Sequence, residues 1–335
     1  MGKKFLITAL LILTVLIGAC GNKGKQASTN PNSSPEQSGG TGETERITIK
    51  YAPLSGVSGI AVQFGAAKGF FEEEGLDVEF ISVQDPITGL LSGDIDIADA
   101  PTTNAILSAG KGAPIKMVSS LFRSKGAFYL IGQGDIESIE ELKGKTIGAA
   151  KFGSGLDVYT RTILQEHGLD PDKDVTLVAN GTHQEAYASF TNGQVDATII
   201  HEPWVSYAES EKTGKLLARG WDYLPTFHTG VLVASDDAIA EKPEAIKRLL
   251  RAYFTSQKYA KENTEEFKEF YLANSKVDAG VLSLALEREL EIWENDPNVS
   301  IDSLNDTQKI QQDLGFQDEL YDVEKFVDLR FIPEN

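Results

Sequence analysis

One short pattern occurs twice in the chain and constrains its fold more than any other feature. Residues 92–96 (Ser-Gly-Asp-Ile-Asp) and 192–196 (Asn-Gly-Gln-Val-Asp) place a glycine, a β-branched residue and an aspartate at the same spacing. Each copy leads into a short apolar strand that ends near a proline, Pro101 or Pro203. Such β-branched, nearly uncharged strands are typical of sheets that are covered on both faces. The repeat therefore predicts two α/β units of similar topology.

The two units share further segments, which occur in the same order. These are a strand at 47–51 or 146–150, a small-residue loop at 53–59 or 152–155, Gly-Leu-Asp at 75–77 or 168–170, and a strand at 78–83 or 175–179. Two copies indicate two lobes with one cleft between them. In open α/β sheets ligands bind at the carboxyl ends of the strands, so His201, Glu202 and Trp204 at the end of the second repeat become candidates.

The chain is expected to cross between the lobes twice, near 128–132 and near 228–231. After Asp236 the apolar spacing is helical, with helices expected at 242–262, 265–272, 278–294 and from Asp306. We therefore predict an α/β fold with lobe 1 at 46–130 and 230–335, lobe 2 at 131–229, and the C-terminal helices packed on lobe 1. A two-crossing hinge of this kind suits closure around a ligand.

The N-terminus has the pattern of an export signal. A basic start and an apolar stretch that is short for a membrane span predict a signal peptide at 1–19. Residues 17–20 (Ile-Gly-Ala-Cys) resemble the bacterial lipobox, which implies diacylation of Cys20 with fatty acids such as palmitate. The alternative is an ordinary signal peptide with an incidental cysteine. Cys20 is the only cysteine, so no disulfide, thiol nucleophile or cysteine-based metal site is expected.

Residues 20–45 are polar and rich in Gly, Ser and Asn, which predicts a flexible linker. The formal net charge of −19 argues against nucleic acid and against a polybasic membrane surface. We expect attachment to the extracytoplasmic face of the cell membrane through the lipid only. Gly144-Lys145-Thr146 lacks the upstream glycine of a phosphate-binding loop and is interpreted as a turn into a strand. We expect no cofactor.

Two matching loops are candidates for ligand contact. Each lies between a strand and a helix, where small residues let backbone N–H groups approach a ligand. Their residues are Ser55, Gly56, Val57 and Ser58 in the first unit, and Phe152, Gly153, Ser154 and Gly155 in the second. The alternative is that both loops are only tight turns between a strand and a helix and contact no ligand.

Other candidates follow the two repeated strands. Pro101 and Thr102 open a helix, where the threonine could cap the helix or contact a ligand. Asp94, Asp96 and Asp99 alternate along the first strand without the spacing of an EF-hand, so we expect no metal there.

Three histidines, His183, His201 and His228, could approach the cleft. No zinc-binding spacing and no nucleophile elbow accompany them. Glu202 could form an acid–base pair with His201, but we favour a simple hydrogen-bond acceptor for a ligand. Trp204 is the best candidate for an aromatic wall of the cleft, although some aromatic residues in this region must belong to the core.

Several ordered motifs resemble one known family. Residues 68–78 (KGFFEEEGLDV), 142–148 (LKGKTIG) and 193–204 (GQVDA…EPW) are similar to motifs of ABC-transporter solute-binding proteins. The matching group binds nitrate, sulfonate, taurine or thiamine precursors (SsuA/ThiY-like). The resemblance covers roughly residues 47–260. It implies a type II periplasmic-binding-protein fold and delivery of a small ligand to a permease and its ATPase.

The same resemblance implies that residues 55–59, Pro101-Thr102, 153–155 and Glu202 line the ligand site. Sulfonate binders of the group often carry an aspartate and a tyrosine where this chain has Glu202, Pro203 and Trp204. A buried carboxylate repels anions and accepts hydrogen bonds from amines. We therefore favour a thiamine-pyrimidine-like or other planar nitrogenous ligand, and an oxyanion such as a sulfonate is the alternative.

Two rival functions remain open. A yeast-type pyrimidine synthase shares the architecture, but it carries a cysteine-rich motif that this chain lacks. A lipoprotein that binds ligand only to signal to a membrane sensor would have the same motifs. We expect a monomeric, non-enzymatic binding protein.

Overall fold

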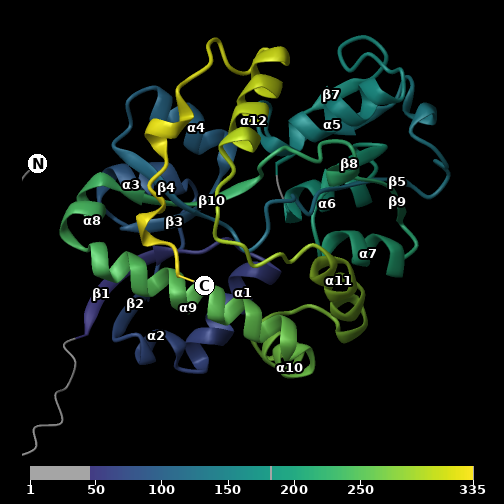
Figure 1. The fold of residues 1–335 in the computed structure, drawn as a ribbon. Helices are drawn as coiled ribbons and strands as arrows, with labels where there is room; N and C mark the ends of the chain where they lie inside the picture. The colour runs from purple at the N-terminus through teal and green to yellow at the C-terminus, as the bar shows by residue number, and fades with distance from the viewer. Residues whose placement is uncertain (1–45, 182, 335) are drawn as a thin grey trace, which may run out of the picture. The chain divides into compact units, whose positions relative to one another are not determined.

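Two five-stranded sheets with matching strand order form the framework of the protein (Figure 1). The computed structural model describes residues 46–181 and 183–334. In the first lobe the sheet order is β2-β1-β3-β10-β4. Its strands are β1 (Ile47–Ala52), β2 (Leu76–Phe80), β3 (Ile97–Pro101), β4 (Ile115–Ser120) and β10 (Gly230–Ser235).

In the second lobe the sheet order is β7-β6-β8-β5-β9. Its strands are β5 (Tyr129–Gln133), β6 (Thr146–Gly148), β7 (Thr176–Val178), β8 (Ala197–Ile200) and β9 (Gly214–Arg219). Position by position, the order repeats that of the first lobe. The repeated Gly-x-β-branched-Asp pattern precedes β3 and β8, which are the central strands of the two sheets.

Helices surround both sheets. In and around the first lobe they are α1 (Val57–Ala67), α2 (Phe70–Glu73), α3 (Pro86–Ser92), α4 (Thr102–Gly110), α8 (Asp236–Glu241), α9 (Pro243–Glu262) and α10 (Thr264–Asn274). The second lobe contains α5 (Gly155–Glu166), α6 (Gln184–Thr191) and α7 (Trp204–Ser210). Near the C-terminus lie α11 (Ala279–Glu291) and α12 (Ile301–Asp313). The described residues also form the 3-10 turns η1 (Glu140–Leu142), η2 (Gly220–Asp222), η3 (Val323–Phe326) and η4 (Leu329–Phe331).

Each sheet contains one strand that arrives from the other lobe. β5 follows β4 along the chain but pairs antiparallel with β8 and β9 of the second lobe. β10 follows β9 but pairs antiparallel with β3 and β4 of the first lobe. The chain thus crosses between the lobes twice, where the sequence predicted it. The two-lobe α/β fold class is confirmed.

The first-lobe core shows why β10 is apolar on both faces. Leu232 and Ala234 face the cluster formed with α1 and α9, whereas Val231 and Val233 face the cluster formed with α4. Side chains alternate between the two faces of a strand, so a central strand covered by helices on both sides has apolar residues throughout.

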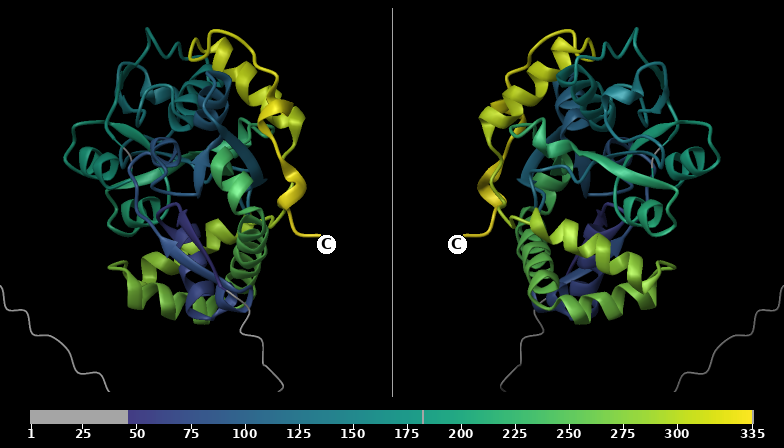
Figure 2. Two further views of the ribbon diagram at one scale, coloured as in Figure 1. Left: turned by 90° about the vertical axis from the view of Figure 1, so that its left-hand side faces the viewer. Right: turned by 90° about the vertical axis from the view of Figure 1, so that its right-hand side faces the viewer.

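The C-terminal helices differ in part from expectation. α9 and α10 pack on the first lobe, as predicted, and α9 makes its largest contact with α1. α11 packs against the first-lobe core through Leu282 and Leu286 and also against α7 of the second lobe. α12 contacts α4 of the first lobe, while its Ile310 joins a second-lobe cluster. In Figures 1 and 2 the yellow segment after α12 runs down one side of the molecule to the C-terminus, over α4, β4 and α9 of the first lobe. Apolar spacing predicts a buried helix face but not the lobe that buries it.

The predicted signal peptide, Cys20 and linker lie outside the described residues. Within the described ranges, no helix has the length and apolar character needed to span a bilayer. The lobe boundaries predicted from the sequence stay a prediction, although β5 as a whole belongs to the second sheet.

Candidate functional site

A buried carboxylate organises the first-lobe loop that follows β1. Asp99, on β3, accepts hydrogen bonds from the Tyr51 hydroxyl at 2.7 Å and from the Leu54 N–H at 3.0 Å. Burial raises the pKa of Asp99 to about 7, and the two hydrogen bonds oppose that rise. Asp99 therefore holds a backbone donor of the loop that the sequence assigned to ligand contact.

The candidates of this loop are not equivalent. Ser55 is exposed, and Gly56 has a φ of 83°, which favours glycine. A Cβ placed on Gly56 would lie 4.0 Å from the carbonyl oxygen of Glu202, so the loop approaches the second lobe here. Val57 belongs to the first-lobe core, and Ser58 is buried beneath α9, whose Gln257 donates to its carbonyl. Of these four residues, Ser55 and Gly56 stay candidates for ligand contact.

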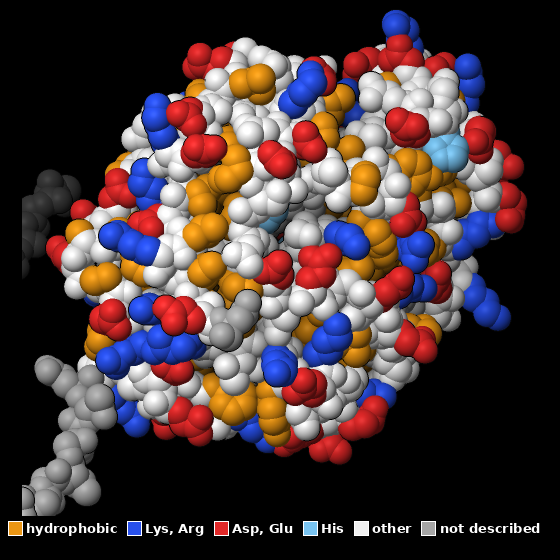
Figure 3. Space-filling model, in the orientation of Figure 1, with side chains coloured by type: hydrophobic (Ala, Val, Ile, Leu, Met, Phe, Trp, Pro, Cys, Tyr) orange, Lys and Arg blue, Asp and Glu red, His pale blue; other side chains and the backbone are white. Residues whose placement is uncertain are grey.

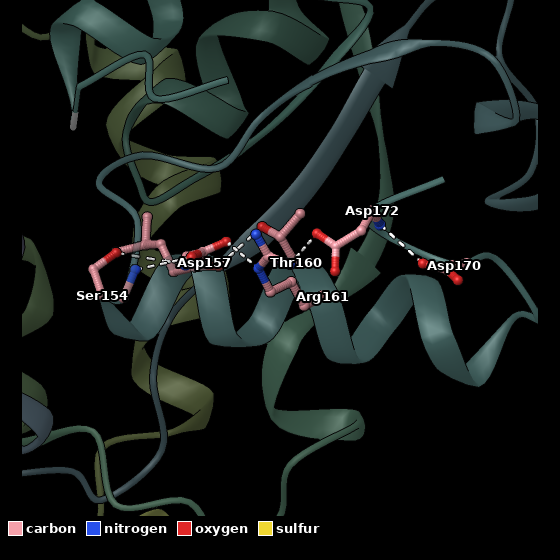
Figure 4. Close-up of polar contacts among 8 residues, drawn as sticks. Ser154, Asp157, Thr160, Arg161, Asp170 and Asp172 are labelled. Atoms are coloured by element: carbon pink, nitrogen blue, oxygen red, sulfur yellow. Dashed lines mark hydrogen bonds and ion pairs between the residues drawn. The ribbon is translucent and has the colours of Figure 1, made fainter. Parts of the chain in front are cut away.

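The matching second-lobe loop is also held by a buried acid (Figure 4). Asp157, in the first turn of α5, accepts a 2.9 Å hydrogen bond from the Gly153 N–H and pairs with Arg161 Nε at 3.0 Å. Arg161 also bonds Asp172 at 2.9 Å. Ser154 caps the helix by accepting from the Asp157 N–H. The anion-favouring helix N-terminus thus already carries a carboxylate with its own counter-ion.

A pocket of about 380 Å³ lies between part of this loop and the first lobe. Its walls are Asn104 and Leu107 of α4, the segment from Lys151 to Ser154, and Phe316 after α12. Phe152 is 49% exposed at its edge. The loop after β6 and the helix after β3 therefore line one concave surface.

Thr102 and His228, two residues chosen from the sequence, are in direct contact. Thr102 Oγ1 lies 3.0 Å from His228 Nδ1, and the His228 N–H donates to Thr307 Oγ1 at 2.8 Å. Burial lowers the pKa of His228 to about 4, so the ring is neutral near pH 7. His228 Nε2 and the neighbouring Thr103 Oγ1 are buried without a hydrogen-bond partner among the described residues. Pro101, just before Thr102, is exposed.

His201 lies at the end of β8 in an aromatic environment. Its ring is 4.1 Å from the ring of His183 and 5.8 Å from that of Phe128, which belongs to the first crossing. Burial, then His183 and Arg123, lower the pKa of His201 well below its usual value. Arg123 itself is paired with Glu289.

Glu202 has protein partners that the sequence did not predict. Its Oε1 lies 2.7 Å from Nη1 of Arg288 on α11, and its Oε2 accepts from the Ser206 N–H at 3.1 Å. Arg288 also pairs with Glu209. Burial raises the pKa of Glu202, and Arg288 opposes the rise. The carboxylate joins α11 to the second lobe, so the expected contact with a ligand stays a prediction.

Trp204 stacks within the second lobe. Its ring lies 5.1 Å from Tyr187 of α6 and 5.7 Å from Tyr207 of α7. The three rings form an aromatic cluster between these helices, and the side chain of Trp204 is partly buried against the second-lobe core. Trp204 therefore contributes to the packing of the second lobe, and its predicted role in the wall of the cleft stays a prediction.

Sequence reasoning missed Asp157, Arg161 and Arg288. The Ser154-x-x-Asp157 spacing is that of a capping box and marks the start of α5, so Asp157 was within reach of the sequence. Arg288 lies 86 residues from its partner Glu202, and no local pattern connects the two.

The arrangement is suited to binding. Loops from both lobes meet, the arginines nearby are paired with carboxylates, and neutral polar atoms are left without partners among the described residues. Within those residues, no three His, Cys, Asp or Glu side chains gather as a metal site would require.

The fold is that of two-lobed periplasmic-binding-type proteins. A ligand-binding component of an ABC-type import system from Staphylococcus aureus matches with a TM-score of 0.72 at 16% identity, covering 85% of this chain and 98% of that one. The alkanesulfonate-binding protein SsuA from Xanthomonas axonopodis matches with a TM-score of 0.67 at 18% identity, covering 82% and 93%. A family model described as NMT1/THI5 like matches residues 60–273. The chain belongs to the NMT1/THI5-like family, which confirms the resemblance seen in the sequence.

Sequence relatives carry two kinds of name. YtlA of Bacillus subtilis, named as a binding protein, is 26% identical over 253 residues, 72% of each chain. A second B. subtilis protein, named for binding aliphatic sulfonates, is 26% identical over 99% of this chain and 95% of its own length. A 4-amino-5-hydroxymethyl-2-methylpyrimidine phosphate synthase of Saccharomyces cerevisiae is 27% identical, over 58% of this chain and 60% of the synthase.

Proposed function

We propose that the protein is the extracytoplasmic solute-binding component of an ABC import system. It captures a small ligand between its lobes and delivers it to a permease driven by an ATPase. The observation that carries this proposal is that strand-end segments of the two lobes meet: the loop after β6 lines one pocket with α4, and Gly56 of the loop after β1 approaches Glu202. The family and the binding-protein names of the B. subtilis relatives support it.

The ligand that the site favours is an uncharged, planar nitrogenous compound, such as a thiamine-type pyrimidine. Asp99 and Asp157 each accept an N–H donor of the loops that would otherwise hold an oxyanion. In both lobes an anion would therefore compete with an acidic side chain for these N–H donors. The pyrimidine in the name of the yeast relative is consistent with this ligand class.

A sulfonate or related oxyanion is the second candidate. Lys151 lines the pocket of about 380 Å³, and one relative is named for aliphatic sulfonates. Over the face drawn in Figure 3, however, acidic and basic side chains are mixed and form no basic patch.

Native mass spectrometry of protein purified without refolding tests the capture function. A co-purified small molecule released by denaturation is the expected result, and its mass distinguishes an amino-heterocycle from a sulfonate. Titration calorimetry with the released compound should then show one site per chain. Stoichiometric binding without any co-transcribed permease would favour a sensing lipoprotein.

We also propose that the protein does not transform its ligand. Cys20 is the only cysteine, so a cysteine-rich synthase motif is absent from the sequence. Recovering the bound compound chemically unchanged after prolonged incubation would agree with this proposal. A modified compound would favour the synthase-like alternative.

Attachment through a lipid on Cys20 is part of the proposal. Cys20→Ser should move the protein from the membrane fraction to the medium or periplasm, because lipidation is the only membrane contact proposed. Immunoblots of the fractions measure this change. Persistence of the variant in the membrane fraction would contradict the lipid anchor.

A further inference from the structure

Two histidine rings from different loops of the second lobe stack on each other. His201 immediately follows β8, and His183 immediately precedes α6. Their ring centroids lie 4.1 Å apart, with an angle of 39° between the planes. Both loops follow the carboxyl ends of strands, which is where the other candidate contacts of this lobe lie.

An aromatic ring from the first crossing borders this pair. Phe128 meets His201 edge-on, with centroids 5.8 Å apart and an interplanar angle of 85°. Phe128 also packs against Tyr159 and lies close to Gly155, on which a Cβ would be 3.7 Å away. The pair is thus adjacent to the hinge and to the loop after β6.

The pair carries unused hydrogen-bonding capacity. His201 Nε2 is inaccessible to solvent and has no partner among the described residues. A buried polar atom without a partner lowers the stability of the folded protein. His183 has a φ of 50°, a conformation that side chains rarely adopt and that is concentrated at binding sites. The unpaired nitrogen of His201 and the backbone conformation of His183 both lower stability, which favours a role for this pair in binding.

Both imidazoles are neutral near pH 7. Burial lowers the pKa of His183, and burial together with His183 and Arg123 lowers the pKa of His201. A neutral imidazole offers one donor and one acceptor. It therefore suits an uncharged partner, whereas an oxyanion binds best to a cationic donor.

We propose that His183 and His201 form a recognition subsite for the uncharged nitrogenous ring of the ligand, with Nε2 of His201 as its hydrogen-bonding atom. This inference rests on the proposed capture function and adds His183 to the residues that serve it. Phe128 borders the His201 ring of this subsite on the side of the hinge.

Binding to the full-length protein tests the subsite, with 4-amino-5-hydroxymethyl-2-methylpyrimidine and ethanesulfonate as probes. Calorimetry should show binding of the pyrimidine and weaker or no binding of the sulfonate. His201→Ala and His183→Ala should each weaken pyrimidine binding about tenfold, since each removes a desolvated contact. His201→Gln, whose amide can reach the position of Nε2, should restore part of the affinity.

His167→Ala is the matched control. His167 bonds Glu140 and Tyr223, away from the pair, so its loss should leave the affinity unchanged. Thermal unfolding verifies that each variant is folded. In ¹⁵N histidine spectra the pyrimidine should shift the His201 ring resonances but not those of His167, which a purely structural role would not produce.

The outcomes separate the subsite from the capture function. Pyrimidine binding that survives both alanine substitutions would overturn the subsite and leave capture intact. Tight ethanesulfonate binding without pyrimidine binding would overturn the neutral-ring assignment and likewise leave capture intact. Binding of neither probe would overturn the subsite, and the absence of any co-purified ligand would additionally count against capture.

Discussion

At the scale of single residues, Asp99 and His228 are buried titratable groups with opposite pKa shifts. Asp99 supports the first-lobe loop through Tyr51 and Leu54, and its pKa is raised to about 7 from 3.8. His228 supports the start of α4 through Thr102, and its pKa is lowered to about 4 from 6.5. At a pH between its ordinary and its shifted pKa, each group is largely neutral in the folded protein but charged in the unfolded chain.

Asp99→Asn should change how stability depends on pH. Between about pH 4 and 7 the folded protein binds the Asp99 proton more tightly than the unfolded chain does. The contribution of Asp99 is therefore complete below pH 4 and is lost as the pH rises to 7, by an amount of order 2–4 kcal/mol. Denaturant unfolding of wild type and variant across this range should give a free-energy difference that shifts in favour of the variant as the pH rises.

The comparison with a variant is necessary because His228 acts in the opposite direction. Its contribution is present above pH 6.5 and is lost as the pH falls towards 4. The two slopes oppose each other in the wild-type protein. A pH-independent difference between wild type and Asp99→Asn would contradict the raised pKa.

At the scale of elements, the first turn of α5 shows how one helix start sets the shape of a binding loop. Asp157 is fully buried and fixes Gly153, and Arg161 neutralises it beneath the ring of Phe316, 5.5 Å away. The loop therefore depends on an ion pair within the helix rather than on a ligand.

Arg161→Met should destabilise the protein by about 3 kcal/mol, because it leaves the Asp157 carboxylate buried without its counter-ion. Asp172→Asn is the matched control. It cuts the other contact of Arg161, but the Asp172 side chain is 74% exposed, so the loss should stay below about 1 kcal/mol. Denaturant midpoints of the two variants measure the difference, and equal losses would show that the buried pair contributes no more than the exposed one.

Local sequence patterns predicted most elements but not all of their ends. The strand expected from Val78 begins at Leu76, because Gly75 turns the chain with a φ of 71° and Leu76 pairs with Ile47. The helix expected from Asp306 begins at Ile301, where the Ser300 hydroxyl accepts the N–H of Ser303. Both starts carry a local signal in the sequence, a turn glycine at Gly75 and a capping serine at Ser300.

The candidate site was predictable only in outline. The repeat placed both loops, Thr102 and His201 after the carboxyl ends of strands, where the structure has them, whereas His228 lies just before β10. The partners of these residues come from far along the chain, as with Thr307 for His228 and Arg288 for Glu202. Periodicity carries no information about such pairs, because they depend on how complete lobes pack.

At the scale of the whole folded unit, α11 is a third connection between the lobes. Arg288 reaches Glu202 and Glu209, and Glu289 reaches Arg123 in the first crossing. Ile292, just after the helix, enters the second-lobe core. Leu282 and Leu286 of the same helix belong to the first-lobe core, so opening of the lobes must break one of these two sets of contacts.

Arg288→Ala should loosen the two lobes and destabilise the protein by about 3 kcal/mol, since Glu202 loses its buried partner. X-ray scattering of the ligand-free variant should give a larger radius of gyration than that of the wild type. Arg251→Ala is the matched control, because Arg251 pairs with Glu74 inside the first lobe. A radius unchanged in Arg288→Ala, or enlarged equally in the control, would argue against α11 as an interlobe connection.

The exchange of strands between the sheets also sets an order of folding. All five strands of the second sheet lie within residues 129–219, whereas the first sheet lacks β10 until residues 230–235 have been synthesised. The second sheet is contiguous and closes shorter loops, so it can form while the first is still missing a central strand. Pulse-labelled hydrogen exchange during refolding should therefore protect β5 and β8 before β3 and β4. The first lobe, although its strands begin the chain, would then finish folding after the second.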